Sequence, residues 1–292
     1  MKKLFLVAAL LLAAVVADAQ ILWKIEGKDL KAPCYVFGTH HMAPLSILDS
    51  LDGFEAAYQS VDKVCGELVM SEMQSPKALG IMQSMMAMPD GKNMSSLFSE
   101  EDFAKLSKLF KELSGMDIKM LEKVKPAVVM QQIVLLENMK NFKDFDMNKQ
   151  LDSYIQAKAA QDGKKIAGLE TIEKQLALLF DASLEEQVKS LMHIVDNADE
   201  MKESVQVLTD AYMTQDLDGL LKLMMAEAEG EDGSGEDLDR ILFDRNAEWG
   251  KVMPEMMSEG PIMFVVGAGH LPGEKGVLYL LSEQGYEVTP VK

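Results

Sequence analysis

The chain has 292 residues, of which 48% are hydrophobic, and its formal net charge is −18. This hydrophobic content excludes a disordered chain and allows one large domain or two smaller domains with a full buried core. The excess of acidic over basic residues excludes a generic binder of nucleic acid or anionic lipid, because such binding depends on Lys and Arg side chains that neutralise phosphate.

The N-terminus has the three-part layout of a secretory signal peptide. Two lysines precede an apolar run over residues 4–16, and small residues at 17–19 come directly before Gln20. The run is shorter than the roughly 20 apolar residues that a transmembrane helix needs. We therefore expect residues 1–19 to be a signal peptide. Residues 20–292 are then an exported, periplasmic or extracellular protein, with no membrane insertion after cleavage.

Short apolar runs bounded by Gly, Pro or Asp indicate six strands. They lie at Ile21–Ile25, Cys34–Phe37, Val61–Val69, Lys165–Leu169, Ile262–Val266 and Tyr286–Val291. Gly27 and Asp29 between the first two runs predict a hairpin, so part of the sheet should be antiparallel. The remaining long segments have helical spacing, for example Leu48–Ser60 and Leu238–Met257. This order predicts an α/β (α+β) fold with a mixed sheet and a large helical insertion over about residues 71–160.

The chain has only two cysteines, Cys34 and Cys65, which excludes a disulfide scaffold. Two alternatives stay open from the sequence. The two residues can form a single bridge if their strands are neighbours, or they can be two inert buried thiols.

Three of the four histidines lie in two short segments that each follow a predicted strand. The first segment, residues 38–44, contains His40 and His41, and the second, residues 267–272, contains His270. Both segments contain the pattern GxxH, followed by an apolar residue and a nearby proline. A glycine at a strand end permits a sharp turn and a close approach, so both loops can direct an imidazole to the same edge of the sheet.

Acidic residues also follow predicted strands. Glu67 comes directly after a glycine at the end of an apolar run, and an ionised carboxylate there needs a metal ion, an Arg or several hydrogen-bond donors. Glu170 ends a similar run, where it either belongs to the site or, with Thr171, caps the following helix. Arg245 lies in a helical segment, and helical spacing alone favours its pairing with Asp244 or Glu248 on a solvated face.

The types of these side chains suggest metal chemistry. His41, His270 and Glu67 together are a ligand set for a divalent ion such as Zn²⁺, Mn²⁺ or Co²⁺. Their donor atoms should then lie about 3–4 Å apart. The same three groups can also act without a metal ion, as a general base and a proton shuttle.

Five segments of the chain resemble the TraB/GumN family in order and spacing: LWKIEGKDLKAPCYVFGTHHM, GELV, GLETIEKQL, FDRNAEW and VVGAGHLPGEKGVLYLLSEQGYEVTPV. The resemblance covers nearly all of residues 20–292. It implies a Tiki-like and EreA/ChaN-like core, shared with metalloproteases of the Tiki type and more distantly with erythromycin-esterase-like and heme-binding proteins. The motifs of the family match Gly38, His41, Glu67, Glu170, the Arg245–Asn246 pair, Gly267 and His270. His40 occupies a position that is more often apolar in the family.

Two functions follow from this resemblance and from the side chains. The first is a metal-dependent hydrolase of peptide or ester bonds, with Glu67, Glu170 and Arg245 as catalytic residues and with His41, His270 and Glu67 as metal ligands. The second is a non-catalytic periplasmic binding protein for a peptide or a tetrapyrrole. Two histidines and several acids at strand ends are more titratable groups than a passive apolar pocket needs, which favours the hydrolase. The expected partner is a peptide or small-molecule substrate.

Overall fold

The computed structural model describes residues 20–141, 149–228 and 238–291. The predicted signal peptide, residues 1–19, lies outside these ranges. Within them, no helix is both long enough and apolar enough to cross a membrane.

Six strands form one mixed sheet in the order β4-β3-β5-β2-β1-β6. The strands β4, β3, β5 and β2 run parallel to one another, whereas β1 is antiparallel to both β2 and β6. The predicted mixed sheet and its N-terminal hairpin are therefore confirmed. The strands are β1 (Leu22–Glu26), β2 (Cys34–Thr39), β3 (Lys63–Gly66), β4 (Lys165–Gly168), β5 (Ile262–Gly267) and β6 (Glu287–Pro290).

The central strand β5 shows why these segments form a sheet. Its residues 262–266 are all fully buried, as expected for a parallel strand that is covered on both faces. The neighbouring strand β2 is buried along its whole length. In the hairpin, Leu22 lies opposite Phe37 and Ile25 lies opposite Cys34. In β1 only Leu22 and Ile25 are buried, which matches its place near the edge of the sheet.

Helices connect the parallel strands, as the sequence predicts for most of the chain. They are α1 (Phe54–Ser60), α2 (Pro76–Met86), α3 (Glu100–Ser114), α4 (Pro126–Asn141), α5 (Leu151–Gln161), α6 (Ile172–Phe180), α7 (Leu184–Asp196), α8 (Ala198–Met213), α9 (Leu217–Ala228), α11 (Asp244–Ser258) and α12 (Val277–Glu283). The expected helix Leu48–Ser60 is divided, because Gly53 adopts a left-handed conformation with φ of 80° before α1 begins. The expected helix Leu238–Met257 begins with a π-helical turn, Asp239–Phe243, which continues into α11.

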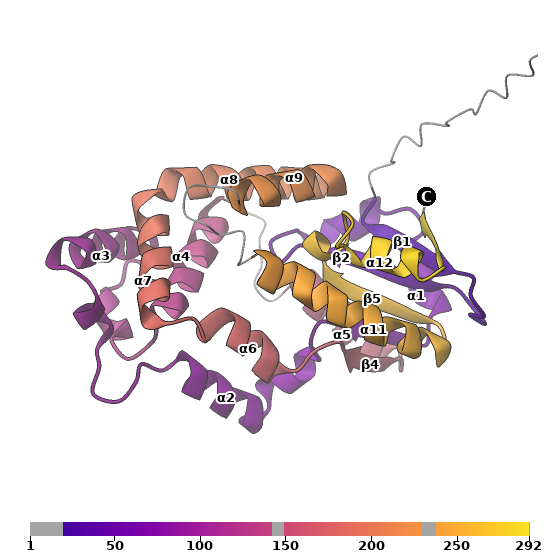
Figure 1. Ribbon diagram of the computed structural model, residues 1–292, viewed down its shortest axis with the longest axis horizontal. Helices are drawn as coiled ribbons and strands as arrows, with labels where there is room; N and C mark the ends of the chain where they lie inside the picture. The colour runs from indigo at the N-terminus through magenta and orange to yellow at the C-terminus, as the bar shows by residue number, and fades with distance from the viewer. Residues whose placement is uncertain (1–19, 142–148, 229–237, 292) are drawn as a thin grey trace, which may run out of the picture.

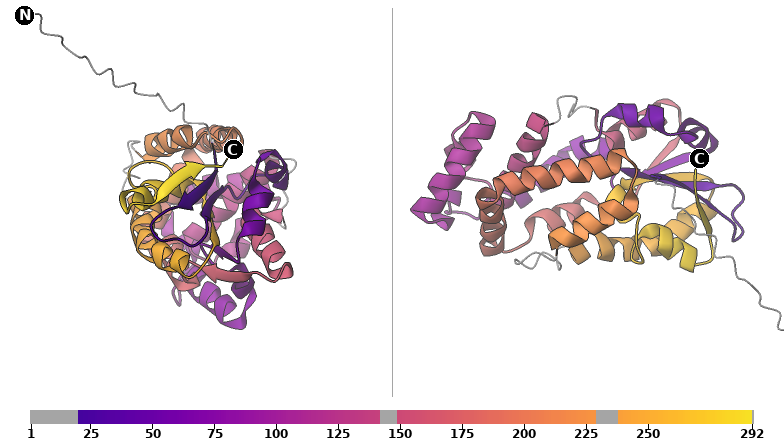
Figure 2. Two further views of the ribbon diagram at one scale, coloured as in Figure 1. Left: turned by 90° about the vertical axis from the view of Figure 1, so that its right-hand side faces the viewer. Right: turned by 90° about the horizontal axis from the view of Figure 1, so that it is seen from above.

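The molecule has two parts that lie side by side (Figure 1). One part contains the sheet with α1, α5, α11 and α12, and the other contains α2, α3, α4 and α7. Helix α8 runs back toward the sheet and packs against α9, which contacts residues 268–270 (Figure 2). The helical part has a hydrophobic core of its own, with Leu106, Phe110 and Ile133 fully buried.

Cys34 and Cys65 are both buried and free. They lie on β2 and β3, and β5 separates these strands in the sheet. Of the two alternatives that the sequence left open, the structure therefore has the buried thiols.

Candidate functional site

The four parallel strands end at one edge of the sheet. β2 ends at Thr39, β3 at Gly66, β4 at Gly168 and β5 at Gly267. In open α/β sheets, ligands bind outside the carboxyl ends of the strands. The histidines and acids that follow these ends within three positions are His40, His41, Glu67, Glu170 and His270. The strand topology thus brings all the histidines and acids singled out in the sequence to the same edge.

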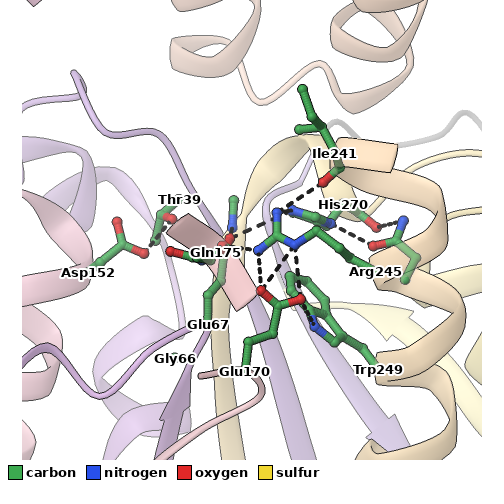
Figure 3. A network of polar contacts seen from close by, with 12 residues as sticks. Thr39, Gly66, Glu67, Asp152, Glu170, Gln175, Ile241, Arg245, Trp249 and His270 are labelled. Carbon is green, nitrogen blue, oxygen red and sulfur yellow. Dashed lines mark hydrogen bonds and ion pairs between the residues drawn. The ribbon is translucent and has the colours of Figure 1, made fainter. Parts of the chain in front are cut away.

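Arg245 lies at the centre of these residues (Figure 3). This side chain comes from the first turn of α11 and is almost completely buried. Its Nη2 donates to Glu67 Oε2 at 2.6 Å, and its Nε donates to Glu170 Oε1 at 3.0 Å. A buried guanidinium is tolerated only with such compensation by paired charges. Arg245 therefore faces the interior rather than the solvated face that helical spacing alone favours.

Glu170 is held in place by more than one donor. Its side chain has an exposed fraction of 0%, and its Oε1 also accepts a hydrogen bond from Trp249 Nε1 at 3.0 Å. The neighbouring Thr171 caps α6, because its hydroxyl accepts a hydrogen bond from the Lys174 backbone N–H at 3.3 Å. The two interpretations of this segment thus apply to different residues: Thr171 caps the helix, and Glu170 belongs to the buried network.

Glu67 accepts hydrogen bonds on both carboxylate oxygens. The backbone N–H of Gly267 donates to Oε1 at 2.8 Å, and Gln175 Nε2 donates to Oε2 at 2.9 Å beside Arg245. Burial opposes the ionisation of Glu67, but the neighbouring His270 and Arg245 and the Gly267 N–H outweigh it, so that the pKa of Glu67 lies below its ordinary value. His270 is neutral, as its hydrogen bonds, described next, require. The permanent positive charge of Arg245 is therefore the main cause of the lowered pKa of Glu67. Glu67 is therefore an ionised carboxylate at neutral pH.

His270 is a buried, neutral imidazole. Its Nδ1 lies 2.6 Å from Asn246 Oδ1, and its Nε2 lies 3.1 Å from Arg245 Nη1. Because Arg245 can only donate, Nε2 must accept and Nδ1 must carry the proton. Burial lowers the pKa of His270 to about 3, which agrees with this assignment. The Trp249 ring, with its centroid 4.3 Å from that of the imidazole, further fixes the ring of His270.

His41 has a different environment from His270. Its side chain is 66% exposed, and its Nδ1 lies 3.4 Å from Asp152 Oδ2. The hydroxyl of Thr39 donates to the other oxygen of Asp152 at 2.9 Å. The contact with the Asp152 carboxylate raises the pKa of His41 to about 9, so this imidazole is protonated at neutral pH. The neighbouring His40 is lowered in pKa to about 4 by burial, and its Nδ1 accepts a hydrogen bond from the Met42 N–H.

The glycines of the two GxxH segments permit close approaches. A Cβ atom at Gly38 would lie 3.1 Å from Ala268 Cα, so the first segment packs directly on the second. A Cβ atom at Gly267 would lie 3.3 Å from Glu67 Oε1, which the Gly267 N–H binds. Tyr212 supports the first segment from α8, because its hydroxyl donates to the Gly38 carbonyl at 3.0 Å.

The donor atoms are only partly arranged as the metal-site hypothesis requires. His270 Nε2 lies 3.7 Å from Glu67 Oε1, within the expected range for two ligands of one ion. The same Nε2 accepts a hydrogen bond from Arg245, however, and the acid partner of His41 is Asp152 rather than Glu67. Within the described residues, no group of three or more His, Cys, Asp or Glu side chains is placed to hold a metal ion. As they lie, these side chains do not fit a metal ion, and the ion itself stays a prediction.

The sequence did not indicate three residues that complete this site. Trp249 lies one helical turn after Arg245 on α11, so the i,i+4 spacing was a usable signal. Asp152 lies in the first turn of α5, where an acid also stabilises a helix N-terminus. Gln175 lies inside α6, in the GLETIEKQL segment that carries part of the family resemblance, so its membership of that segment was a usable signal. For Asp152 the sequence offered no signal that distinguishes a site residue from an ordinary helical one.

Comparison with known proteins identifies the family of the chain. The chain is 22% identical over 282 residues to an uncharacterized protein of Treponema pallidum (strain Nichols), a match that covers 91% of this chain and 81% of that protein. No solved structure matches significantly. The model of the TraB/PrgY/gumN family matches residues 21–290, which is nearly the whole chain. The chain therefore belongs to the TraB/PrgY/gumN family.

Proposed function

We propose that the chain is a hydrolase of peptide or ester bonds that acts at the carboxyl edge of the parallel strands. One observation carries the proposal: this edge brings together an ionised carboxylate, Glu67, and a protonated, exposed imidazole, His41. Two titratable groups whose surroundings move their pKa values in opposite directions relative to neutral pH provide a base and an acid. A site that only binds an apolar ligand does not need such a pair.

Each group has a definite part in this proposal. Among the described residues, Glu67 Oε1 accepts a hydrogen bond from one donor, the Gly267 N–H, so it can accept a proton from an attacking water molecule. The water oxygen forms a bond to the substrate carbonyl carbon, and the protonated His41 gives its proton to the leaving amine or alcohol as the old bond breaks. Solvent then returns the proton from Glu67 to His41. Arg245 supplies fixed positive charge at this edge, which stabilises a developing oxyanion.

Covalent catalysis by a cysteine has no support. Burial raises the pKa of the Cys65 thiol to about 12 and also raises that of Cys34. The thiolate is the nucleophilic form of cysteine, so both residues are unreactive at neutral pH. Water is therefore the nucleophile in the proposed reaction.

The test is hydrolysis of a peptide and ester library by the wild type and by Glu67→Gln. The amide keeps the size of the side chain but cannot take up the proton, so turnover should fall by about 10²–10⁴-fold. The fold should survive, because Arg245 keeps its contacts with Glu170. Glu248→Gln is the matched control, since Glu248 is an exposed residue on α11 and its substitution should leave the rate unchanged.

Each assay is run with a chelator and with added Zn²⁺, Mn²⁺ or Co²⁺. Activity that persists in the chelator supports the acid–base proposal, and activity that requires one of the ions supports the predicted metal-dependent hydrolase. Cleavage by Glu67→Gln at the wild-type rate removes Glu67 from the mechanism. If the wild type cleaves nothing under any condition, the binding protein for a peptide or tetrapyrrole becomes the better assignment.

A further inference from the structure

Arg245 has no N–H group left for a substrate. Its Nε–H donates to Glu170, and the two hydrogens of its Nη2 go to Glu67 and Glu170. The two hydrogens of its Nη1 go to the Ile241 carbonyl at 3.0 Å and to His270 Nε2 at 3.1 Å. A guanidinium has no further N–H groups. Arg245 therefore acts on a substrate oxygen through its charge alone, and a direct hydrogen bond to that oxygen has to come from another residue.

His40 has an N–H donor whose position is defined by the fold. The Met42 backbone N–H donates to His40 Nδ1 at 3.1 Å. An imidazole nitrogen that accepts a hydrogen bond carries no proton, so the proton of His40 is on Nε2. Within the described residues, Nε2 has no hydrogen-bond partner and is not one of the buried side-chain atoms that lack a partner. The Nε2–H group therefore reaches solvent and can donate to a ligand.

The contacts of the His40 ring determine where this N–H points. Nδ1 is bound to the backbone of its own segment, and Nε2 lies at the far end of the ring, so the Nε2–H bond points away from that segment. The ring lies beside that of Tyr212, with the two centroids 5.3 Å apart. The Tyr212 hydroxyl in turn donates to the Gly38 carbonyl at 3.0 Å. These contacts fix the donor before a substrate binds, which lowers the entropy cost of binding.

The strand order places His40 across β5 from Glu67. In the sheet β5 lies between β2 and β3, and Thr39 at the end of β2 lies opposite Gly267 at the end of β5. His40 and Glu67 each follow one of the outer two strands, which are about 10 Å apart because neighbouring strands are spaced by about 5 Å. Between them, the Gly267 N–H binds Glu67 Oε1, the oxygen proposed to take the proton of water. A water molecule on this oxygen and a substrate carbonyl group fit between the carboxylate and the imidazole.

Gln175 also has a hydrogen on Nε2 beyond the one that binds Glu67, but it lies at the other carboxylate oxygen. Gln175 Nε2 donates to Glu67 Oε2 at 2.9 Å, and Arg245 donates to the same oxygen at 2.6 Å. The carboxylate itself therefore separates Gln175 from a water molecule on Oε1. This arrangement favours His40 as the donor on the Oε1 side.

We propose that His40 Nε2–H donates a hydrogen bond to the carbonyl oxygen of the substrate, an inference that rests on the hydrolase proposed above. When the water oxygen bonds to the carbonyl carbon, an electron pair of the carbonyl group moves to its oxygen, and Nε2–H stabilises the negative charge. The pair returns when the bond to the leaving group breaks, and His40 keeps its proton throughout. His41 gives its proton to the leaving group, so the two adjacent histidines have different parts in the reaction.

The test compares side chains at position 40 in the hydrolysis assay. His40→Phe keeps an aromatic ring beside Tyr212 but removes the donor, so kcat should fall by about 10²–10³-fold. KM should change less, because the oxygen carries its full charge only in the transition state. His40→Gln places an amide nitrogen as far from the backbone as Nε2 and should recover most of the loss. His40→Asn places its amide at the position of Nδ1 and should be as slow as His40→Phe.

The matched control is His193→Phe, the same change at an exposed histidine of α7 in the helical part, which should leave kcat unchanged. Circular dichroism shows that each variant is folded. Nitrogen-15 nuclear magnetic resonance of the wild type adds a measurement that does not depend on activity. His40 should be a neutral imidazole with its proton on Nε2, whereas His270, which binds Asn246 through Nδ1, should carry its proton on Nδ1.

Each outcome of these experiments decides the role of His40. A wild-type rate in His40→Phe, or equal losses in His40→Phe and His40→Gln, overturns this role while the hydrolase itself stands. A proton on His40 Nδ1 also overturns it, whatever the rates are. A loss in His193→Phe as large as in His40→Phe assigns both losses to general destabilisation and overturns it as well. If the wild type cleaves nothing, the hydrolase proposal fails and the role of His40 fails with it.

Discussion

The two GxxH segments share a motif but differ in the state of their histidines. His270 is buried, neutral and held between Asn246 and Arg245, and its pKa is lowered to about 3. His41 is exposed and paired with Asp152, and its pKa is raised to about 9. Both follow a parallel strand at the same edge of the sheet.

This difference shows how little of the chemistry lies in the motif itself. Each segment places a histidine at the end of a strand, but its charge is decided by a residue from a helix that is distant in sequence. That residue is Asp152 of α5 for His41, and Asn246 with Arg245 of α11 for His270. An acidic partner stabilises the protonated, positively charged form of a histidine. A neutral amide together with a permanent positive charge stabilises its neutral form.

The largest expected effect comes from Arg245→Ala, which breaks the network around the second segment. It leaves Glu67 and Glu170 buried without their main counter-charge, so the free energy of unfolding should fall by about 3–5 kcal/mol. Urea denaturation at pH 7 measures this fall in the free energy of unfolding. The control is Lys251→Ala on the same helix. Among the described residues this exposed lysine pairs with Glu248 alone, so it should contribute less than about 0.5 kcal/mol. Equal losses for the two variants would contradict the buried network.

The second test compares His270→Ala with His41→Ala. Removing the imidazole of His270 leaves a cavity beside Trp249 and leaves Asn246 Oδ1 without its hydrogen-bond partner, so we expect a loss of about 2–4 kcal/mol. Removing the exposed His41 should lower the free energy of unfolding by less than about 1 kcal/mol. Urea denaturation under the same conditions compares the two. A larger loss for His41→Ala than for His270→Ala would reverse the comparison.

The third prediction concerns pH, and the two histidines should respond with opposite sign. The folded-state pKa of His41 is raised from 6.5 to about 9, so its contribution to stability is complete below pH 6.5 and is lost as the pH rises through 9. The folded-state pKa of His270 is lowered from 6.5 to about 3, so its contribution is present above pH 6.5 and is lost as the pH falls through 3.

Nuclear magnetic resonance of the imidazole signals checks this prediction directly. One signal, assigned by its loss in His41→Ala, should titrate near pH 9, and the signal of His270 should show a neutral ring down to acidic pH. Asp152→Asn should return the pKa of His41 toward 6.5, because it removes the acidic partner. Titration of both rings near pH 6.5 would show that their surroundings do not differ as described.

The smallest expected effect comes from Thr39→Val. The change keeps the shape of the side chain but removes the hydroxyl that donates to Asp152 Oδ1, which should cost about 1 kcal/mol in the free energy of unfolding. Urea denaturation measures the cost, with the exposed residue Thr214 changed to Val as the control. The pKa of His41 should fall less than in Asp152→Asn. A fall as large as in that variant would make Thr39, and not the charge of Asp152, the cause of the shift.

Much of the strand pattern could be predicted from the sequence because it depends on local patterns. The six apolar runs all contain strands of the sheet, since buried parallel strands need continuous apolar residues. The strand ends were less accurate: the run predicted at Val61–Val69 is a strand only over Lys63–Gly66. Beyond Gly66 the chain turns toward the site, which an apolar run does not reveal.

The sequence by itself determined which residues follow the parallel strands, and hence that His41, Glu67, Glu170 and His270 lie at one edge. The tertiary structure alone decided which of them are charged and which of them touch. Arg245 is the clearest case, because helical spacing favoured a solvated face and the fold buries this residue between two carboxylates. The physical reason is that a pKa depends on burial and on charges within a few ångströms. For Glu67, Glu170 and His41 such neighbours come from helices more than 70 positions away in the chain, and for His270 they come from a helix 24 or 25 positions away.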